Sequence, residues 1–438
     1  MLNQFLFKKI DIGSLLIFRI FFGILISLEC YGAILTGWVK NTLIDPTFTF
    51  SFIGFEWLQP LAGNGMYFYF LVMGTLGVFI SIGYKYRYSI LAFTFLWVGV
   101  YLMQKTSYNN HYYLLALISF IMIFLPANKG YSIDAKQNPL LRSTSMHSYV
   151  KWIIVIQIFI MYTYGSIAKL YGDWFDLSII KILMQPKADY YLIGSLLQEH
   201  WVHIAIAVTG ISFDLVVVPA LLWKPTRKIA FILSLLFHLF NSAVFQIGIF
   251  PYMALAFSVF FFEPETIRNI FFKKSILYRE NKIVIPPFTH TITVFFGLYF
   301  LIQLILPIRH HFIPDDVLWT EEGHRMSWRM MLRSRSGIIE FKVVNKADGS
   351  TKTVPLENYL TRKQRRKVAA YPDFIWQFAQ HLKKEYAKNN VDISVYVNSK
   401  MSVNDRSYET YINSEIDLAN VSWLHFTHNE WILPSNFE

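Results

Sequence analysis

The chain has almost no cysteine and little charge. Its 438 residues include a single cysteine, Cys30, so no disulfide can form within the chain and the redox environment cannot be read from a disulfide framework. Charged residues make up only 16% of the sequence, whereas 54% is hydrophobic and 18% aromatic. A composition this apolar excludes an ordinary soluble enzyme of this length and indicates a membrane protein.

Sequence patterns that hold metals, nucleotides or an activated serine are also missing. There is no HExxH pair, no cysteine pair and no carboxylate–histidine spacing typical of a metal site. Neither a glycine-rich phosphate loop nor a nucleophile elbow is present. We therefore expect no metal and no nucleotide cofactor. The net charge of +11 is assigned to cytoplasmic loops and a basic C-terminal segment, so we expect no nucleic-acid partner.

Long apolar runs are what the sequence has in place of these motifs. Runs of about 17–25 apolar residues can span a bilayer. We count about nine candidate transmembrane helices, of which the second, fourth and eighth are short and one could be re-entrant. The first is expected to be a retained helix and not a signal peptide. The nine spans are 13–37, 67–82, 88–104, 112–127, 150–168, 201–222, 229–246, 248–263 and 290–307.

Lysine and arginine concentrate in alternate loops between these spans, which predicts a cytoplasmic N-terminus and an extracytoplasmic C-terminus. With this orientation, 105–111, Lys169 and 246–248 all fall at the outer membrane face. The short loops suggest a bacterial inner-membrane protein, with membrane lipid around the bundle.

The composition changes after Pro307, so we divide the chain into a membrane domain, 1–308, and an extracytoplasmic α+β or β-rich domain, 309–438. Residues 338–355 alternate as two strands around an Asp348-Gly349 turn, and 374–389 has the period of an amphipathic helix. Further strands are expected at 391–397 and 408–412.

Lys169 is the most informative single residue. It follows an almost entirely apolar run and lies in Tyr164-Gly-Ser-Ile-Ala-Lys-Leu-Tyr-Gly-Asp-Trp174. An ionisable group beside hydrocarbon is costly and marks a candidate functional site. Because burial disfavours the charged form of lysine, such a residue can serve as a neutral base. The structural alternative is a lysine that snorkels from a helix end to the interface.

Three other polar features lie beside the spans. Asn110 and His111 could orient a ligand at the membrane surface, or they could form a helix N-cap within an aromatic belt. His238 and Asn241 share a helix face, where a histidine could equally make a helix–helix hydrogen bond. Asp214, inside the sixth span, is expected to pair with a buried base and order the bundle; Arg19 is one possible partner.

These segments together resemble the vitamin K-dependent γ-glutamyl carboxylases and their bacterial relatives, which share an HTTM-type membrane domain. Matching segments occur in the same order over residues 18–336, and the match fades after about residue 345. They are Phe18-Arg-Ile-Phe-Phe-Gly23, Tyr84-Lys-Tyr-Arg87, Lys105-Thr-Ser-Tyr-Asn-Asn-His111 with Ala127-Asn128, Ala168-Lys169-Leu170 with Asp173-Trp174, Phe213-Asp214-Leu215, Phe237-His238 through Phe250, and Trp319-Thr-Glu321 with Ser327-Trp-Arg-Met-Met331 and Ser334-Arg-Ser336.

The resemblance implies a reaction. Reduced vitamin K (phylloquinol or menaquinol) would react with O2 and be epoxidised, and the strong base so produced would remove a γ-proton from a peptide glutamate. Addition of CO2 would then give γ-carboxyglutamate. The expected partner is a glutamate-containing peptide or protein.

The resemblance also implies roles for particular residues. Lys169 would be the catalytic base, with His111 and His238 in the same pocket. The quinol would contact four residues, Asn110, Asn241, Met330 and Met331. The peptide would contact three, His324, Trp328 and Arg335.

The chain departs from the family in ways that concern the peptide more than the quinol. It cannot form the disulfide of the vertebrate members, and it is much shorter. His324 aligns with a tyrosine of the family's site, and Arg329 and Arg333 replace other residues. Two alternatives therefore stay open: a quinol epoxidase without glutamate carboxylation, and a non-enzymatic membrane scaffold or lipid transporter.

Overall fold

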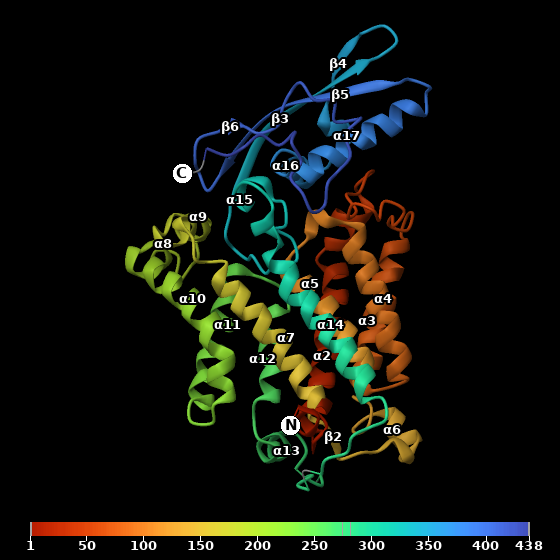
Figure 1. Cartoon of the computed structure of the whole chain (residues 1–438), viewed down its shortest axis with the longest axis vertical. Coiled ribbons are helices and arrows are strands. Elements are labelled where there is room, and N and C mark those ends of the chain that lie inside the picture. Colours follow the sequence, from red (N-terminus) through yellow and green to blue (C-terminus); the bar gives the residue numbers. More distant parts are fainter. Residues whose placement is uncertain (1, 274, 281, 437–438) are drawn as a thin grey trace.

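A helical bundle capped at one end by a smaller α+β domain makes up the protein (Figure 1). The computed structural model describes residues 2–273, 275–280 and 282–436. The long helices of the bundle are α2 (Gly13–Leu35), α3 (Gly65–Ile82), α4 (Tyr86–Met103), α5 (Asn110–Phe124), α7 (Ser148–Ile167), α10 (His200–Leu222), α11 (Arg227–Phe245) and α14 (Thr289–Ile308). The shorter ones are α1 (Leu2–Leu6), α6 (Ile133–Gln137), α8 (Gly172–Phe175), α9 (Ser178–Met184), α12 (Phe250–Ala256) and α13 (Pro264–Phe271).

Each of the nine expected spans corresponds to a helix. Among the residues that the structure describes, seven helices are long and apolar enough to cross a membrane, namely α2, α3, α4, α7, α10, α11 and α14. The fourth and eighth spans are shorter apolar helices, Asn110–Phe124 and Phe250–Phe260. Large apolar side chains of α14, such as Leu298 and Ile302, are more than half exposed, as expected for a surface that faces lipid. The protein is therefore an integral membrane protein; its bacterial origin and its orientation stay predictions.

Helices α2 and α3 pack unusually closely because glycine lines their contact. A Cβ atom on Gly23 would lie 2.4 Å from the backbone nitrogen of Ser81, so only glycine fits there. Ser27 donates its hydroxyl proton across the same contact to the carbonyl of Gly74, at 2.9 Å. Small residues that let backbones approach are the usual means of holding helices together in lipid.

Buried charges also order the end of the bundle away from the C-terminal domain. Strand β1 (Lys9–Asp11) pairs antiparallel with β2 (Ser145–His147), and Asp11 forms an ion pair with Arg268 at 3.0 Å. Arg19 donates to backbone carbonyls, including that of Ala127 at 3.0 Å. Arg19 is thus occupied at this end and is not the partner of the carboxylate expected inside the sixth span.

The C-terminal domain is a four-stranded antiparallel sheet, in the order β4-β3-β5-β6, with two helices against it (Figure 1). Phe341 in the sheet meets Phe378 of helix α17 edge-on at 4.9 Å, which places the domain's core between sheet and helix. The expected hairpin, the expected helix and both further strands are present. The elements are α15 (Val317–Thr320), β3 (Arg335–Asn345), β4 (Thr351–Thr353), α16 (Arg362–Val368), α17 (Pro372–Ala387), β5 (Ile393–Val403) and β6 (Glu409–Thr410).

Buried polar contacts join this domain to the bundle. Lys105, in the turn between α4 and α5, lies 2.5 Å from the carboxylate of Asp373 at the start of α17. On the other side of the interface, Asp173 accepts hydrogen bonds from Arg406 and from the amide of Asn404, the latter at 2.6 Å. Residues of both parts therefore form this interface, while the boundary at 308 stays a prediction.

Candidate functional site

Lys169 lies in the turn just after α7 and belongs to a buried ion pair. Its Nζ donates to Asp214 Oδ2 at 2.6 Å and to the carbonyl of Gly165 at 2.8 Å, and the ring of Trp174 is 5.6 Å away. Both charged side chains are less than a tenth exposed. Lys169 therefore does not extend to an aqueous surface as a snorkelling lysine would. Asp214 has the buried basic partner that its position predicts, and that partner is Lys169.

Two glycines make room for this pair. A Cβ atom on Gly210 of α10 would lie 3.0 Å from the Trp174 ring, and that ring faces the Lys169 ammonium group. A Cβ atom on Gly165 would lie 3.3 Å from the methyl group of Met330 and 3.5 Å from Asp214 Oδ2. The bare backbone at Gly165 thus lets Met330, from the C-terminal part of the chain, pack against α7 beside the ion pair.

The two expected histidines meet on a shared aromatic residue. His111 of α5 stacks on Phe250 with ring centroids 3.9 Å apart, and His238 of α11 meets the same ring edge-on at 6.1 Å. His238 Nε2 is hydrogen-bonded to the hydroxyl of Tyr162, at 2.9 Å, as the structural alternative for this histidine predicts. Its other ring nitrogen is buried and has no hydrogen bond among the described residues.

The lysine and the histidines belong to neighbouring parts of one region. Phe213, which adjoins Asp214 in α10, meets His238 edge-on at 5.7 Å. No hydrogen bond within the described part of the chain joins Lys169 to either histidine. Tyr162 precedes Lys169 by seven residues, or roughly 10 Å along a helix. Asn241 lies one turn beyond His238, half-buried.

A narrow apolar cavity lies against His111. It has a volume of about 20 Å³, so a ring system could occupy it only after its side chains move. Glu29 is near the same region and accepts a hydrogen bond from Tyr112 at 2.7 Å. The cavity is lined by His111, Tyr112, Leu114, Leu115, Ile118, Ile247, Ile249, Phe250 and Met253.

Asn110 connects the bundle to the C-terminal part. The helix N-cap is its neighbour Asn109, whose side chain accepts from Tyr112 N at 2.7 Å. Asn110 instead donates to the carbonyl of Arg329 at 3.2 Å and accepts from the hydroxyl of Tyr108 at 2.9 Å. The helix N-cap expected in this cluster is therefore present, but at Asn109 and not at Asn110.

The segment 321–331 has an unusual backbone. Glu321, Met326, Trp328 and Met331 have φ values of 61°, 60°, 57° and 59°, a left-handed region that costs non-glycine residues about 1–3 kcal/mol each. Such strain persists only where the surroundings fix the backbone, and it concentrates at functional sites. Trp328 is fully buried, with its ring 5.0 Å from that of Tyr113.

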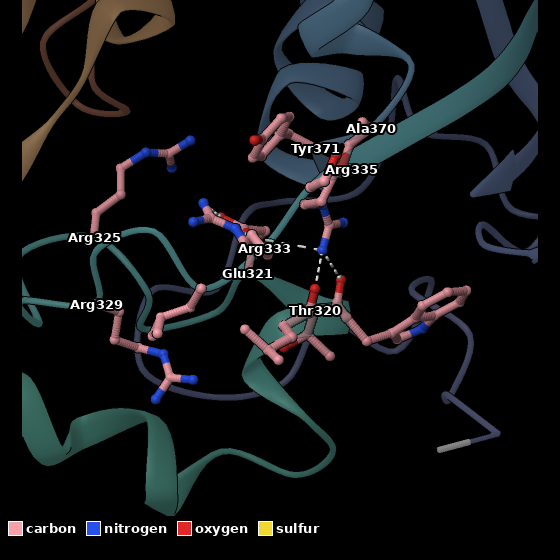
Figure 2. Close-up of polar contacts among 12 residues, drawn as sticks. Thr320, Glu321, Arg325, Arg329, Arg333, Arg335, Ala370 and Tyr371 are labelled. Carbon is pink, nitrogen blue, oxygen red and sulfur yellow. Dashed lines mark hydrogen bonds and ion pairs between the residues drawn. The ribbon is translucent and has the colours of Figure 1, made fainter. Parts of the chain in front are cut away.

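Four arginines lie within this segment or just after it: Arg325, Arg329, Arg333 and Arg335 (Figure 2). Arg333 donates hydrogen bonds to both carboxylate oxygens of Glu321, one of them at 2.7 Å. Arg335 lies 3.7 Å from the same carboxylate. Although burial favours the neutral acid, Arg333 and Arg335 hold the pKa of Glu321 below its usual range. Arg335 also donates to the carbonyls of Trp319 and Ala370, at 2.9 and 2.8 Å, so its guanidinium orders the chain locally.

His324 is enclosed among these cations. Its side chain is almost fully buried, and Nδ1 has no hydrogen bond among the described residues. Burial, together with the charges of Arg333, Arg329 and Arg325, keeps the pKa of His324 well below its usual value. His324 is therefore a neutral imidazole with an unused polar atom.

Comparison with known families accounts for most of the chain. Residues 7–265, more than half of the protein, match the HTTM domain, and residues 288–438 match the lumenal domain of vitamin K-dependent gamma-carboxylase. The chain belongs to the vitamin K-dependent gamma-carboxylase family. A search of solved structures gives no match.

Membership in the gamma-carboxylase family agrees with the resemblance found in the sequence, and it implies vitamin K as cofactor and glutamate-containing substrates as partners. The roles expected for individual residues stay predictions. Sequence reasoning missed Tyr162, the hydrogen-bond partner of His238, and Tyr108, whose hydroxyl also accepts from the backbone of Met326 at 2.6 Å. Both are tyrosines among many in an aromatic chain, so no pattern singles them out.

Proposed function

We propose that the protein uses reduced vitamin K, O2 and CO2 to carboxylate peptide glutamate at the γ-carbon and epoxidises the quinol in the same cycle. The observation that carries this proposal is the buried Lys169–Asp214 pair, which lies beside Gly165, where Met330 of the C-terminal part packs. Family membership supports it. A buried amine next to hydrocarbon is the group that such a reaction needs as its first base.

Asp214 gives Lys169 a way to become neutral without an external acceptor. The ammonium must lose a proton before it can take one, and Asp214 Oδ2 is 2.6 Å away. Transfer of that proton leaves an amine and a carboxylic acid, neither of which carries a charge that the apolar surroundings must solvate. We therefore assign Asp214 as the proton partner of the base.

The residues around His111 suit a prenylated quinol. When bound, reduced vitamin K would supply, with O2, the strong base that removes the γ-proton. The apolar lining would hold the ring and exclude water, and the buried Nδ1 of His238 offers an unused polar atom. Asn110, Asn241, Met330 and Met331 stay candidate quinol contacts, and a metal is not part of the proposal.

The glutamyl side chain would approach from the side of the C-terminal domain. Arg329 has a buried Nε without a hydrogen bond among the described residues, and its side chain points away from the Glu321 cluster (Figure 2). One Nη nitrogen of Arg329 contacts His310 Nε2 at 3.3 Å, which leaves Nε as the donor for a substrate carboxylate. His324 and Trp328 stay candidate peptide contacts, and Arg335 would act by ordering the backbone around them.

The test is a coupled assay on the full chain in detergent. Purified protein would receive reduced vitamin K, O2, labelled bicarbonate and a short glutamyl peptide. Epoxide and fixed label are expected from the wild type, with both falling at least a hundredfold in Lys169→Ala. Raised pH or an added amine should partly restore the variant. Lys181→Ala, an exposed lysine nearby, serves as the matched control. Epoxide formation undiminished in Lys169→Ala at neutral pH would refute the base assignment.

A quinol epoxidase without carboxylation is the second candidate. The burial of His324 among arginines favours it, because a peptide could reach that ring only after the cluster moves. It predicts epoxide without fixed label for every glutamyl peptide tried. A membrane scaffold or lipid transporter predicts neither product and no O2 consumption.

A further inference from the structure

A strongly basic pocket lies in the C-terminal domain beside helix α16. Its volume is about 570 Å³, which is enough for several side chains of a ligand. Five of its six lining residues are cationic and none is acidic, so it concentrates positive potential in a concave surface. The lining residues are Arg335, Arg362, Lys363, Arg366, Lys367 and Tyr371.

The cations on α16 are not neutralised within the protein. Arg362 and Arg366 are exposed and form no ion pair among the described residues. Lys367 lies over the ring of Tyr371 at 4.5 Å instead of meeting a carboxylate. Burial, and then the charge of Lys367, lower the pKa of Lys363, as expected where like charges crowd together. An anionic ligand would relieve this repulsion.

The rim of the pocket is held in place. Thr361 and Gln364 form a capping box at the start of α16, which satisfies backbone donors at that end. Lys363 donates to the hydroxyl of Ser107 at 2.6 Å, and Gln364 donates to the carbonyl of Phe48 at 2.5 Å. Helix α16 is thus fixed against the outer end of the bundle, so ligand binding does not require ordering it.

One segment connects the pocket to the candidate site. Met330 packs against Gly165, which adjoins the Lys169–Asp214 pair, and Arg335, five residues further on, lines the pocket. Five residues span at most about 18 Å when fully extended. The backbone positions of Met330 and Arg335 therefore lie within about 18 Å of each other. An extended peptide of about six residues can cover that distance, whereas a lipid headgroup bound at α16 cannot.

We propose that this pocket binds an acidic stretch of the peptide substrate, located about five or more residues from the glutamate that reacts. The inference rests on the proposed function for the identity of the ligand, but the pocket's preference for acidic peptides can be measured without turnover. Aspartate or glutamate side chains would pair with Arg362 and Arg366 at the rim and with Lys367 further in.

The experiment compares two fluorescent peptides on the full chain in neutral detergent. Both carry one glutamate; one has four aspartates beginning five residues away, and the other has asparagines at those positions. The acidic peptide is expected to bind roughly tenfold more tightly in low salt and to lose this advantage as salt screens the charges. Arg362→Glu/Arg366→Glu should abolish the advantage. Lys352→Glu/Lys400→Glu, which changes the charge equally on exposed strand positions, should keep it.

In the coupled assay the same pair of substitutions should raise KM for the acidic peptide roughly tenfold more than KM for the asparagine peptide. The milder Arg362→Gln/Arg366→Gln variant, with thermal unfolding measured beside it, separates lost binding from lost folding. Equal affinity of the wild type for both peptides would overturn the inference. A second result would also overturn it: the wild type binds anionic lipid and the Arg362→Glu/Arg366→Glu variant does not, while the variant still prefers the acidic peptide. Acidic-peptide binding without any carboxylation or epoxidation would support the pocket and refute the proposed function.

Discussion

Asp214 and Glu321 are both buried carboxylates held by cations, but their partners differ in kind. Asp214, in the bundle, meets one lysine at 2.6 Å, whereas Glu321, below the sheet, meets Arg333 and Arg335. Lysine can give up its proton when buried, but arginine cannot. The first arrangement is therefore suited to moving a proton, and the second to holding a strained segment in one shape.

The largest expected effect tests the first half of this comparison. Asp214→Asn removes the proton partner of Lys169 while keeping the size of the side chain. If Asp214 takes the proton, epoxide formation should fall about 10²- to 10⁴-fold, with little change in KM for the quinol. The measurement is a pH–rate profile of purified protein. Wild-type rates in Asp214→Asn would show that Lys169 becomes neutral without this carboxylate.

The matching change in the other cluster should act on stability. Glu321→Gln leaves two arginines buried without a counter-charge and should cost about 3–5 kcal/mol of unfolding free energy. Because the pKa of Glu321 is lowered in the folded protein, the wild-type advantage is fully present above about pH 4.3 and falls as the pH drops through the folded value. Denaturation of Glu321→Gln and Asp214→Asn beside the wild type, over a pH series, measures the loss of unfolding free energy in each variant. An equal loss of unfolding free energy in Asp214→Asn would contradict the distinction, because the cation left behind there is a lysine and not an arginine.

Lys105 offers an intermediate case, because it is a lysine in the interface region. Burial lowers its pKa to about 8, although Asp373 opposes the shift. Asp373 also has a second partner, Arg325, at 2.8 Å. Lys105→Met should therefore leave stability unchanged or raise it below pH 8, since a costly buried cation is removed.

The pH dependence of this variant follows from the same shift. The folded protein gives up the Lys105 proton near pH 8, whereas the unfolded chain keeps it to about 10.4. The penalty in the wild type thus disappears as pH rises between these values, and the advantage of Lys105→Met should shrink with it. Thermal unfolding at pH 7 and pH 9.5 tests this. A variant that is less stable at pH 7 would show that the pair with Asp373 outweighs burial.

The smallest expected effect concerns the helix that carries the basic pocket. Thr361→Ala removes the N-cap of α16 and should cost about 1 kcal/mol of unfolding free energy. Peptide affinity should fall modestly because the rim frays, and turnover of the quinol should be unaffected. Thr361→Ser, which keeps the hydroxyl, is the control. A loss of quinol turnover in Thr361→Ala alone would mean that α16 supports the site and not only the pocket.

Much of the fold was predictable because it depends on local pattern. The nine apolar spans, the Asp348-Gly349 hairpin and the amphipathic helix α17 all have a period that the sequence displays. Helix α16 was not predicted, since Arg362–Val368 is almost entirely polar and has no apolar period. Its formation depends on the capping box and on contacts with the bundle, which local propensity does not reveal.

The site was predictable only in part, for a related reason. Burial and residue type drew attention to Lys169 and Asp214 separately, but their pairing depends on how α7 and α10 cross. The positive φ of Trp328 and Met331 could not be foreseen, because neither residue type favours that region. Both features arise from contacts between segments far apart in the sequence.

The ion pairs that join the bundle to the C-terminal domain impose an order on the protein's synthesis. Chains fold from the N-terminus as they are made, at roughly 5–20 residues per second. Lys169 and Asp214 are translated close together, but Lys105 must wait for Asp373, and Asp173 for Arg406. For some tens of seconds the nascent bundle therefore presents unpaired charges where its cap will later sit. In that interval water must remain at those positions, and the last part of the chain to leave the ribosome closes this end of the bundle.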